Sequence, residues 1–363
     1  MAAETLMDIP SLWSPSGTYL NTPSYGLPPR PAWDALQAVL ADWHGGRTGW
    51  QHWGDPVEGA REAFATLVGT DRAQVAIGAN VSGLVALVAG SLPAGTRVVV
   101  PDIEFTSTLF PFLVQPGLEV RTVPPGRLAE AIDEHTDVAA FSAVQMATGE
   151  IADLDAITRA AATHGVLTLV DATQAAGWLP LDATRFDFLV AAAYKWLMSP
   201  RGTAFMTVAP DRLDGVVPAQ AGWYAGESVH DAYSGPPLRL ARDARRLDTS
   251  PAWFSWAGTQ PAIELVNEIG VEAIHAHDVG LANRFRAGLG LPPGDSAIVV
   301  SDHPGGVAEL EAEGIRAAEV LGRLRVGFHL YNSKEDADLA VDVLTRNVAE
   351  DTRPNGAGER PAP

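Results

Sequence analysis

The sequence predicts an α/β fold in which a large domain built on a mostly parallel sheet precedes a smaller C-terminal α/β domain. Short apolar runs alternate with amphipathic helical runs from about residue 60 to residue 208, which is typical of parallel strands with helices on both faces. The alternation resumes from about residue 259, after a stretch of weak periodicity. A chain of 363 residues, 47% hydrophobic and 19% charged, can bury both cores.

Turn residues bound each expected strand of the large domain, and helical spacing of apolar residues marks the helices between them. The expected strands span residues 74–78, 97–101, 119–123, 138–143, 166–171, 186–192 and 202–208. The expected helices span residues 56–68, 81–89, 127–132 and 153–164. Residues 211–251 are rich in Gly, Pro, Trp and Tyr, so we expect a long excursion that lines a crevice or makes a subunit contact.

The C-terminal pattern predicts a compact small domain. Its expected elements are helix 262–287, strand 297–300, helix 306–313, strand 324–327 and helix 334–349. We place the large domain at residues 31–258 and the small domain at residues 259–350. Residues 1–30 are Pro-rich and are expected to run extended and join the small domain, whereas the polar tail 351–363 is expected to be disordered.

Composition limits the classes of function. A net charge of −19 argues against nucleic acid or an anionic membrane as a partner. The chain has no cysteine, which excludes disulfides, thiolate metal clusters and a cysteine nucleophile. No basic-then-apolar signal peptide opens the chain, and glycine and proline interrupt the longest apolar stretch, 83–100, so we expect a cytoplasmic protein.

A carboxylate and a lysine each follow an apolar, strand-like run. Asp171 closes the run 165–171, and Lys195 follows the run 188–194. Residues at the carboxyl ends of strands in an α/β sheet face the ligand crevice. A lysine that can form a Schiff base, an aspartate that can keep a pyridine nitrogen protonated, and Gln174 nearby suit pyridoxal 5′-phosphate (PLP). Asp171 alone is more simply explained as a helix cap, and Lys195 favours the cofactor site.

Three further motifs leave alternatives open. The turn before the helix that starts near Val81 and Ser82 is either a phosphate cradle or an ordinary capped turn. Phe105 follows another expected strand and either stacks on the cofactor ring or belongs to the core. Arg325 opens a strand of the small domain, where its guanidinium suits the carboxylate of an amino acid, although a surface arginine is the commoner interpretation.

Two aromatic-rich segments are equally ambiguous. Thr259, after Gly258, either bonds a phosphate or caps the next helix. The Trp- and Gly-rich segment 43–53 either lines a binding mouth or makes a subunit contact. Its two histidines have no third ligand at a recognisable spacing, so we predict no metal site.

Together these motifs resemble the class V aminotransferase family of fold-type I PLP enzymes, which contains cysteine desulfurases, kynureninase and isopenicillin N epimerase. The resemblance covers nearly the whole chain, and its specific parts are the segments 170–177, 194–202 and 325–332. It implies that Lys195 is the Schiff-base lysine and that Asp171 is the partner of the pyridinium nitrogen. These two residues are therefore the expected catalytic pair.

The resemblance also implies how the cofactor is held. Gln174 matches the residue that bonds the ring oxygen, and Val81 and Ser82 match the phosphate cradle. Thr259 matches a residue that reaches the phosphate from the other subunit, which implies a homodimer with shared active sites. Tyr194 stands where the family often has histidine, and it could contact the phosphate instead.

Substrate binding is implied in the same way. Arg325 matches the arginine for the substrate carboxylate, and the resemblance groups Gln145 and Asn21 with it as substrate-binding residues. The chain departs from the family at Phe105, where histidine often stacks on the ring, and at Ala192, where a hydroxyl residue is usual.

Without any cysteine, persulfide-forming desulfuration is excluded. We predict a C–S β-lyase that converts a cysteine S-conjugate to thiol, pyruvate and ammonia, or a related decarboxylative oxidative deamination of such a conjugate. Lyases of this kind occur in natural-product pathways within the family. The aromatic-rich loops favour a bulky substrate, although core packing is the simpler explanation of them. The alternatives are an aminotransferase or amino-acid epimerase, and a ligand-binding α/β scaffold that would carry no chromophore.

Overall fold

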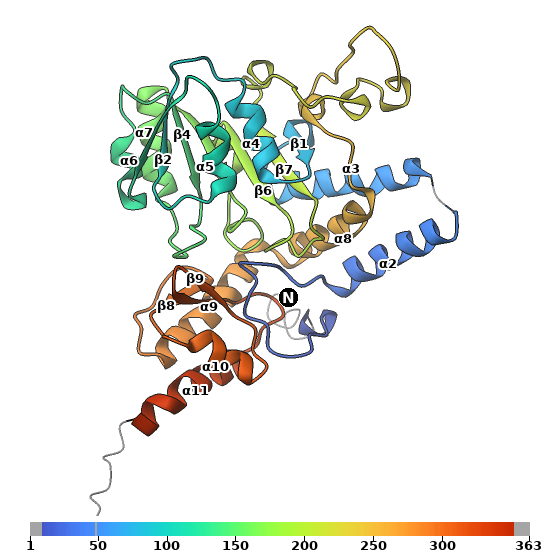
Figure 1. Cartoon of the computed structure of the whole chain (residues 1–363). Coiled ribbons are helices and arrows are strands. Elements are labelled where there is room, and N and C mark those ends of the chain that lie inside the picture. Colours follow the sequence, from blue (N-terminus) through green and yellow to red (C-terminus); the bar gives the residue numbers. More distant parts are fainter. Residues whose placement is uncertain (1–8, 48, 352–363) are drawn as a thin grey trace, which may run out of the picture.

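The computed structural model describes residues 9–47 and 49–351, and it contains a large central sheet (Figure 1). Its strands are β1 (Val75–Gly78), β2 (Arg97–Pro101), β3 (Glu119–Val123), β4 (Val138–Ser142), β5 (Leu167–Asp171), β6 (Phe188–Ala192) and β7 (Ala204–Val208). Their order is β1-β7-β6-β5-β4-β2-β3. Only β7 runs antiparallel to its neighbours. The predicted α/β fold with a mostly parallel sheet is confirmed.

Helices cover both faces of this sheet, as Figure 1 shows. One layer contains α4 (Val81–Ala89) and α5 (Thr106–Leu113), and the other contains α3 (Trp50–Leu67), α6 (Leu128–Ala131), α7 (Leu154–His164) and α8 (Trp253–Ile269). Alternate residues of β2 point to opposite faces of the sheet. Val98 and Val100 pack in the core with α4, whereas Val99 packs in the core on the face covered by α3, α7 and α8. Burial on both faces explains why β4 to β7 are almost continuously apolar.

The small domain contains a three-stranded antiparallel sheet of order β8-β10-β9. Its elements are α9 (Val271–Gly288), β8 (Ile298–Ser301), α10 (Gly306–Ala312), β9 (Ala318–Val320), β10 (Arg323–Gly327) and α11 (Lys334–Asp351). The predicted single helix 262–287 is wrong, because Gly270 has φ +88° and separates α8 from α9. Ile263 and Val266 of α8 belong to the large-domain core. Gly270 therefore separates α8 from α9, Ile274 of α9 packs in the same core, and the division of the chain at residue 258 stays a prediction.

The N-terminal segment runs between the two domains. Tyr19 and Asn21 form parallel bridges to Arg316 and Gly327 of the small domain. Farther on, the Gly26 N–H donates to the Tyr194 carbonyl (2.9 Å), and a Cβ at Gly26 would lie 1.9 Å from the Lys195 oxygen. Only glycine allows this approach, so the segment packs directly against the lysine loop. Residues 1–8 of the predicted segment and 352–363 of the predicted tail lie outside the described residues.

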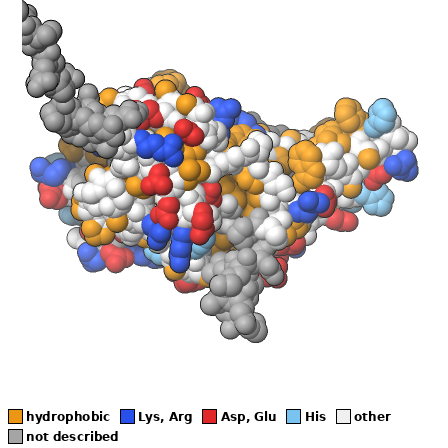
Figure 2. Space-filling view, turned by 90° about the horizontal axis from the view of Figure 1, so that it is seen from below, with side chains coloured by type: hydrophobic (Ala, Val, Ile, Leu, Met, Phe, Trp, Pro, Cys, Tyr) orange, Lys and Arg blue, Asp and Glu red, His pale blue; other side chains and the backbone are white. Residues whose placement is uncertain are grey.

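The hairpin formed by α2 (Arg30–His44) and α3 projects away from the sheet beside α8 (Figure 1). Its aromatic rings meet those of the excursion and of α8: the Trp50 centroid lies 5.0 Å from that of Trp223 and 6.1 Å from that of Trp253 of α8. Hydrophobic side chains also lie on the surface of the arm that extends to the right in Figure 2. The Trp-rich loops therefore pack chiefly on one another, which removes the argument for a bulky substrate.

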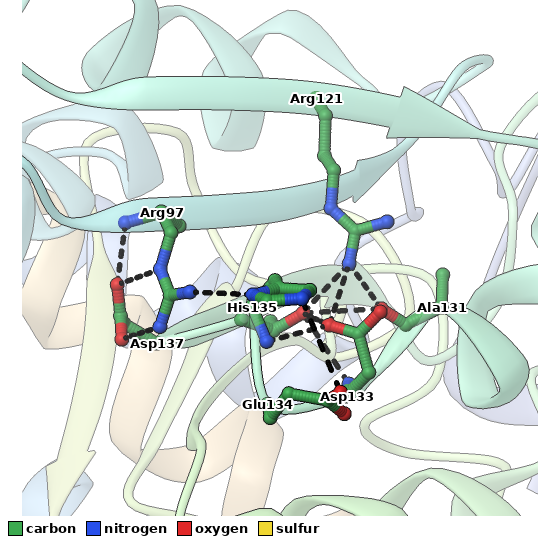
Figure 3. Close-up of polar contacts among 8 residues, drawn as sticks. Arg97, Arg121, Ala131, Asp133, Glu134, His135 and Asp137 are labelled. Atoms are coloured by element: carbon green, nitrogen blue, oxygen red, sulfur yellow. Dashed lines mark hydrogen bonds and ion pairs between the residues drawn. The ribbon is translucent and has the colours of Figure 1, made fainter.

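Arg97 and Arg121 pair with carboxylates near the edge of the sheet where β2 begins, away from the carboxyl ends of the parallel strands (Figure 3). Arg97 of β2 binds both carboxylate oxygens of Asp137, at 2.9 and 2.8 Å, and these bonds lower the pKa of Asp137 to about 2. Arg121 of β3 contacts Asp133 and the Ala131 carbonyl. This edge is a surface network that ties β2 and β3 to the loop before β4. Within residues 9–47 and 49–351, no helix has the length and apolar character needed to cross a membrane.

Candidate active site

A cavity of about 290 Å³ opens at the carboxyl edge of the sheet, where β1, β2, β4, β5 and β6 end. It is lined by Ala79, Asn80, Val81, Ser82, Phe105, Ser107, Ser142, Met146, Asp171, Thr173, Gln174, Ala192, Tyr194, Lys195 and Arg201. The structure thus brings together seven predicted site residues from four separate loops. Parallel strands place their carboxyl ends at one edge, which explains the convergence.

Lys195 is buried, with 6% of its surface exposed. Its Nζ lies 5.4 Å from the Phe105 ring centroid and 5.8 Å from that of Tyr194, and it has no hydrogen-bond or ion-pair partner among the described residues. Burial lowers the pKa of the Lys195 amine to about 8, although the charge of Asp171 opposes this shift. A substantial fraction of the amine is therefore neutral near pH 8, as a nucleophile or base requires.

Asp171 is held by neighbours on two sides. One carboxylate oxygen accepts from the Thr173 N–H (2.8 Å), and the other accepts from the Thr108 hydroxyl of α5 (2.9 Å). Thr173 is itself fixed, because its hydroxyl accepts from the Ala192 N–H (3.0 Å). Two donors leave lone pairs free on the carboxylate, so Asp171 can still accept a hydrogen bond from a protonated ring nitrogen.

Glu104 is a site residue whose role the sequence analysis missed. Its buried carboxylate accepts from the Phe105 N–H (2.8 Å), the Ser142 N–H (2.7 Å) and the Gln145 amide (3.0 Å). Burial raises the pKa of Glu104, and the nearby charge of Asp171 adds to the rise. These bonds fix Phe105 at the cavity wall. An acidic residue soon after the buried apolar run 98–101 is the available signal in the sequence.

The first turn of α4 forms one end of the cavity. Asn80 caps the helix by accepting from the Gly83 N–H (2.8 Å) and from the Ser82 hydroxyl (2.9 Å). The backbone N–H groups of Val81 and Ser82 have no acceptor within a helix that begins there. This end can therefore bind a phosphate through backbone N–H groups and the helix dipole.

The amide of Gln174 already makes two bonds within the chain. Its nitrogen donates to the Pro23 carbonyl (2.9 Å), and its oxygen accepts from the Trp196 indole (2.8 Å). One amide N–H remains for a ring oxygen. The Tyr194 ring lies 5.3 Å from that of Tyr25, and burial raises the pKa of its hydroxyl.

Arg201, which lies within the segment 194–202 and has no role predicted from sequence, lines the same cavity. Its guanidinium carbon lies 4.7 Å over the Tyr194 ring, and no carboxylate among the described residues pairs with it. A cation thus lies near the cavity in addition to Lys195.

Arg325 is buried close to the cavity, with 3% of its surface exposed. Its two terminal nitrogens donate to the Met146 carbonyl (3.1 Å) and the Ser24 hydroxyl (2.7 Å), whereas Nε has no partner. No described carboxylate forms an ion pair with it, and burial lowers the pKa of Arg325 to about 10. The amide oxygen of Asn21 is likewise buried without a partner. The Arg325 guanidinium is suited to bind a carboxylate that the chain itself does not supply, whereas the free Asn21 oxygen can only accept from a donor such as an amine.

The structure places two predicted residues elsewhere. Gln145 lines a separate cavity of about 130 Å³ and donates to Glu104, although its amide oxygen is unpaired. Thr259 is fully buried in α8, where its hydroxyl donates to the Ser255 carbonyl (2.9 Å). This side chain is enclosed within its own chain, and the contact of Thr259 with a phosphate of the other subunit stays a prediction.

The residues around the larger cavity fit PLP. An amine with a lowered pKa faces a carboxylate across a pocket bounded by an aromatic ring, and a helix N-terminus provides an anion site. Lys195, Asp171 and Phe105 can hold the ring, and the start of α4 can hold the phosphate.

Comparisons with known proteins agree with this geometry. The family model described as aminotransferase class-V matches residues 28–321. The uncharacterized aminotransferase YcbU of Bacillus subtilis is 30% identical, covering 82% of this chain and 85% of that protein. Isopenicillin N epimerase of Streptomyces clavuligerus is 30% identical, covering 80% and 84%. The solved cystine C–S lyase C-DES, in complex with cysteine persulfide, superposes with a TM-score of 0.83 at 21% identity, covering 93% and 99%, and shares the fold.

Proposed function

The chain belongs to the class V aminotransferase family of fold-type I, PLP-dependent enzymes that act on amino acids, and we propose that it cleaves the C–S bond of a cysteine S-conjugate by β-elimination. The observation that carries the proposal is the buried Arg325, which has no carboxylate partner among the described residues and whose charge lowers the pKa of Lys195. An amino acid whose carboxylate binds Arg325 would bring its Cα toward that amine.

The bound cofactor supplies an electron sink that stabilises negative charge at the substrate Cα. Asp171 maintains that sink by accepting a hydrogen bond from the ring nitrogen, and its orientation comes from Thr108 and Thr173. Lys195 takes the Cα proton on Nζ, and its lowered pKa leaves a substantial fraction of the amine unprotonated near pH 8. Arg325 holds the carboxylate.

β-Elimination needs little beyond these groups. As the proton moves from Cα to Lys195, the electron pair of the Cα–H bond forms a Cα–Cβ double bond. The Cβ–S bond breaks, and sulfur takes that bonding pair and leaves as thiolate. Hydrolysis of the remaining enamine gives pyruvate and ammonia. A thiolate is a good leaving group and needs no dedicated acid. The chain contains no cysteine to accept the sulfur, which leaves release of the free thiol.

An aminotransferase or an epimerase is the second candidate, because the relatives that are 30% identical carry those names. Transamination would use Lys195 to return the proton to the cofactor side. Epimerisation would require a proton donor on the other face of Cα. Burial raises the pKa of Tyr194, the other proton-bearing side chain close to Lys195, which makes it a poor partner for that role.

The test is an assay of the PLP-loaded enzyme with S-alkyl and S-aryl cysteines. We expect pyruvate and free thiol in equal amounts, at a rate that falls to background in Lys195→Ala. The same mixtures are analysed for D-amino acids and, with 2-oxo acids added, for new amino acids. Transfer or inversion without pyruvate would replace the lyase with the second candidate.

We also propose that the enzyme is a homodimer whose second chain covers the cavity mouth. Helix α5 binds Asp171 through Thr108, yet Phe110 and Leu113 of the same helix are exposed, as are Phe105 and Tyr25 at the mouth. Apolar surface beside a polar site is typical of a subunit contact. Light scattering after gel filtration should give twice the mass of one chain. A fully active species with the mass of one chain would contradict the dimer.

A further inference from the structure

A buried acid–histidine pair joins the small domain to the loop that carries Lys195. Asp278 of α9 lies 2.8 Å from Nδ1 of His329, which follows β10, and Nε2 of His329 lies 2.9 Å from the carbonyl oxygen of Trp196. The Asp278 and His329 side chains are both fully buried. Trp196 is the residue next to Lys195. The pair therefore contacts the large domain one residue from the base.

The chemistry of these contacts determines where the protons are. A carbonyl oxygen can only accept, so Nε2 of His329 must carry a hydrogen. One further proton lies between Nδ1 and the Asp278 carboxyl, since two bare lone pairs would repel at 2.8 Å. The other oxygen of Asp278 has no partner. Asp278 therefore holds His329 in the orientation in which Nε2 donates to the Trp196 carbonyl.

Trp196 is held at its other end as well. Its indole N–H donates to Gln174 (2.8 Å), and its ring packs edge-on against the His329 ring, with centroids 5.2 Å apart. Gly177 approaches so closely that a Cβ there would lie 2.8 Å from the Trp196 oxygen. Bonds at the side chain and at the carbonyl leave this residue little freedom. Because Lys195 is bonded directly to Trp196, the position of its backbone is restricted as well.

We infer that His329, oriented by Asp278, is a positioning residue that sets the distance between Lys195 and Arg325. Arg325 lies in β10 and His329 follows on the same segment, so a single bond to Trp196 links the carboxylate-binding strand to the base-bearing loop. A misplacement of about 1 Å between a base and its substrate can cost roughly a hundredfold in rate. This inference rests on Lys195 as the base, but it does not depend on the fate of the substrate sulfur.

Two substitutions separate the two bonds of His329. His329→Gln places an amide N–H where Nε2 was, so it keeps a donor for Trp196 and loses the bond to Asp278. His329→Asn places its N–H where Nδ1 was, so it keeps Asp278 and cannot reach Trp196. Phe285→Leu, in the same helix as Asp278 and in the small-domain core, controls for general loss of packing.

Each PLP-loaded variant is titrated with pH by visible absorbance, and α-proton exchange of L-alanine in heavy water is followed by NMR. Losing the hydrogen bond to Trp196 should slow exchange about tenfold in His329→Asn and shift the apparent pKa of the cofactor-bound lysine by about half a unit or more. His329→Gln and Phe285→Leu should stay within about threefold of the parent rate. The exchange of the parent enzyme shows beforehand that Cα chemistry occurs, whatever the fate of sulfur.

Equal losses in the Gln and Asn variants, a loss confined to Gln, or no loss in either would overturn the positioning role. If the Asn variant does not fold, the Gln variant decides alone. A folded His329→Gln protein with a shifted lysine pKa and tenfold slower exchange would contradict the inference, because its bond to Trp196 is retained.

Discussion

The guanidinium groups of Arg61 and Arg325 are almost equally buried, at 1% and 3% exposed, yet their surroundings are opposite. Arg61 of α3 lies 2.6 Å from an oxygen of Asp248 and 3.2 Å from one of Glu58. The second oxygen of Asp248 accepts from the Ile77 N–H at 2.8 Å. Arg325 has only a carbonyl and a hydroxyl as partners.

The pKa values of Arg61 and Arg325 differ accordingly. Burial alone would lower the pKa of either arginine, but Asp248 and Glu58 more than offset it and raise the pKa of Arg61. Nothing offsets burial at Arg325, so its pKa falls to about 10. A buried charge without a partner is costly, and it persists where a ligand completes the pair. Arg61 therefore belongs to the structure of the fold, and Arg325 to the binding of an anion.

Removing Lys195 should have the largest effect, since the interpretation of Arg325 requires a reactive amine nearby. We expect Lys195→Ala to lose the visible absorbance band and to lower turnover about a thousandfold or more. The chain has only one other lysine, the exposed Lys334, so Lys334→Ala is the matched control and should keep both. Turnover retained in Lys195→Ala, or lost in Lys334→Ala, would contradict the assignment of Lys195 as the reactive amine near Arg325.

The two arginines should differ in their effect on stability. Arg61→Met leaves the Asp248 carboxylate buried and unpaired, so it should lower the free energy of unfolding by about 3–5 kcal/mol. Arg325→Met removes a buried cation that lacks a carboxylate partner, so unfolding of the cofactor-free protein should be unchanged or more difficult. Urea denaturation of both variants measures the contrast. A similar loss in both would mean that Arg325 is also structural.

The pH dependence of cofactor loading sharpens the contrast further. Below a pH of about 8 the Lys195 amine is mostly protonated and cannot add to an aldehyde. The rate of reconstitution from apoenzyme and PLP should therefore rise with pH through about 8 and then level off. Because Arg325 is one of the charges that lower this pKa, Arg325→Met should move the midpoint upward. A midpoint near the ordinary lysine value in the parent protein would show that Lys195 is not buried as described.

The smallest expected effect concerns the support of Asp171. Thr108→Val removes one of its two hydrogen-bond donors and keeps the side-chain shape. We expect turnover to fall about threefold to tenfold, as for the loss of one ordinary hydrogen bond, with a nearly unchanged KM, because the Thr173 N–H still holds Asp171. Thr163→Val, on the exposed face of α7, is the control. No change in Thr108→Val would leave the orientation of Asp171 to Thr173 alone.

Much of this arrangement could be predicted from sequence, because local patterns determine it. Residues 97–101 and 119–123 match β2 and β3 in full, and Asp171 and Lys195 were assigned to one edge because each follows an apolar run. Helix α5 was not predicted from the sequence, because its aromatic run contains Pro111. The break at Gly270 depends on one backbone angle that periodicity does not reveal.

Contacts between distant segments account for the features that the sequence does not reveal. Thr259 has the residue type and the neighbours of a phosphate ligand, and those features do not reveal its position inside α8. The bonds of Glu104 to Ser142 and of His329 to Asp278 join segments far apart in the chain. No spacing rule in a single sequence pairs such residues.

The most direct test of Arg325 uses a pair of substrates that differ only in the carboxylate. A cysteine S-conjugate and the matching cysteamine S-conjugate are compared as ligands of the PLP-loaded parent protein and of Arg325→Met, by their effect on the visible absorbance of the cofactor. Losing a desolvated, bidentate ion pair should weaken binding of the amino acid about a hundredfold and leave the amine nearly unaffected. Equal weakening of both ligands, or of neither, would contradict the assignment of Arg325 to the substrate carboxylate.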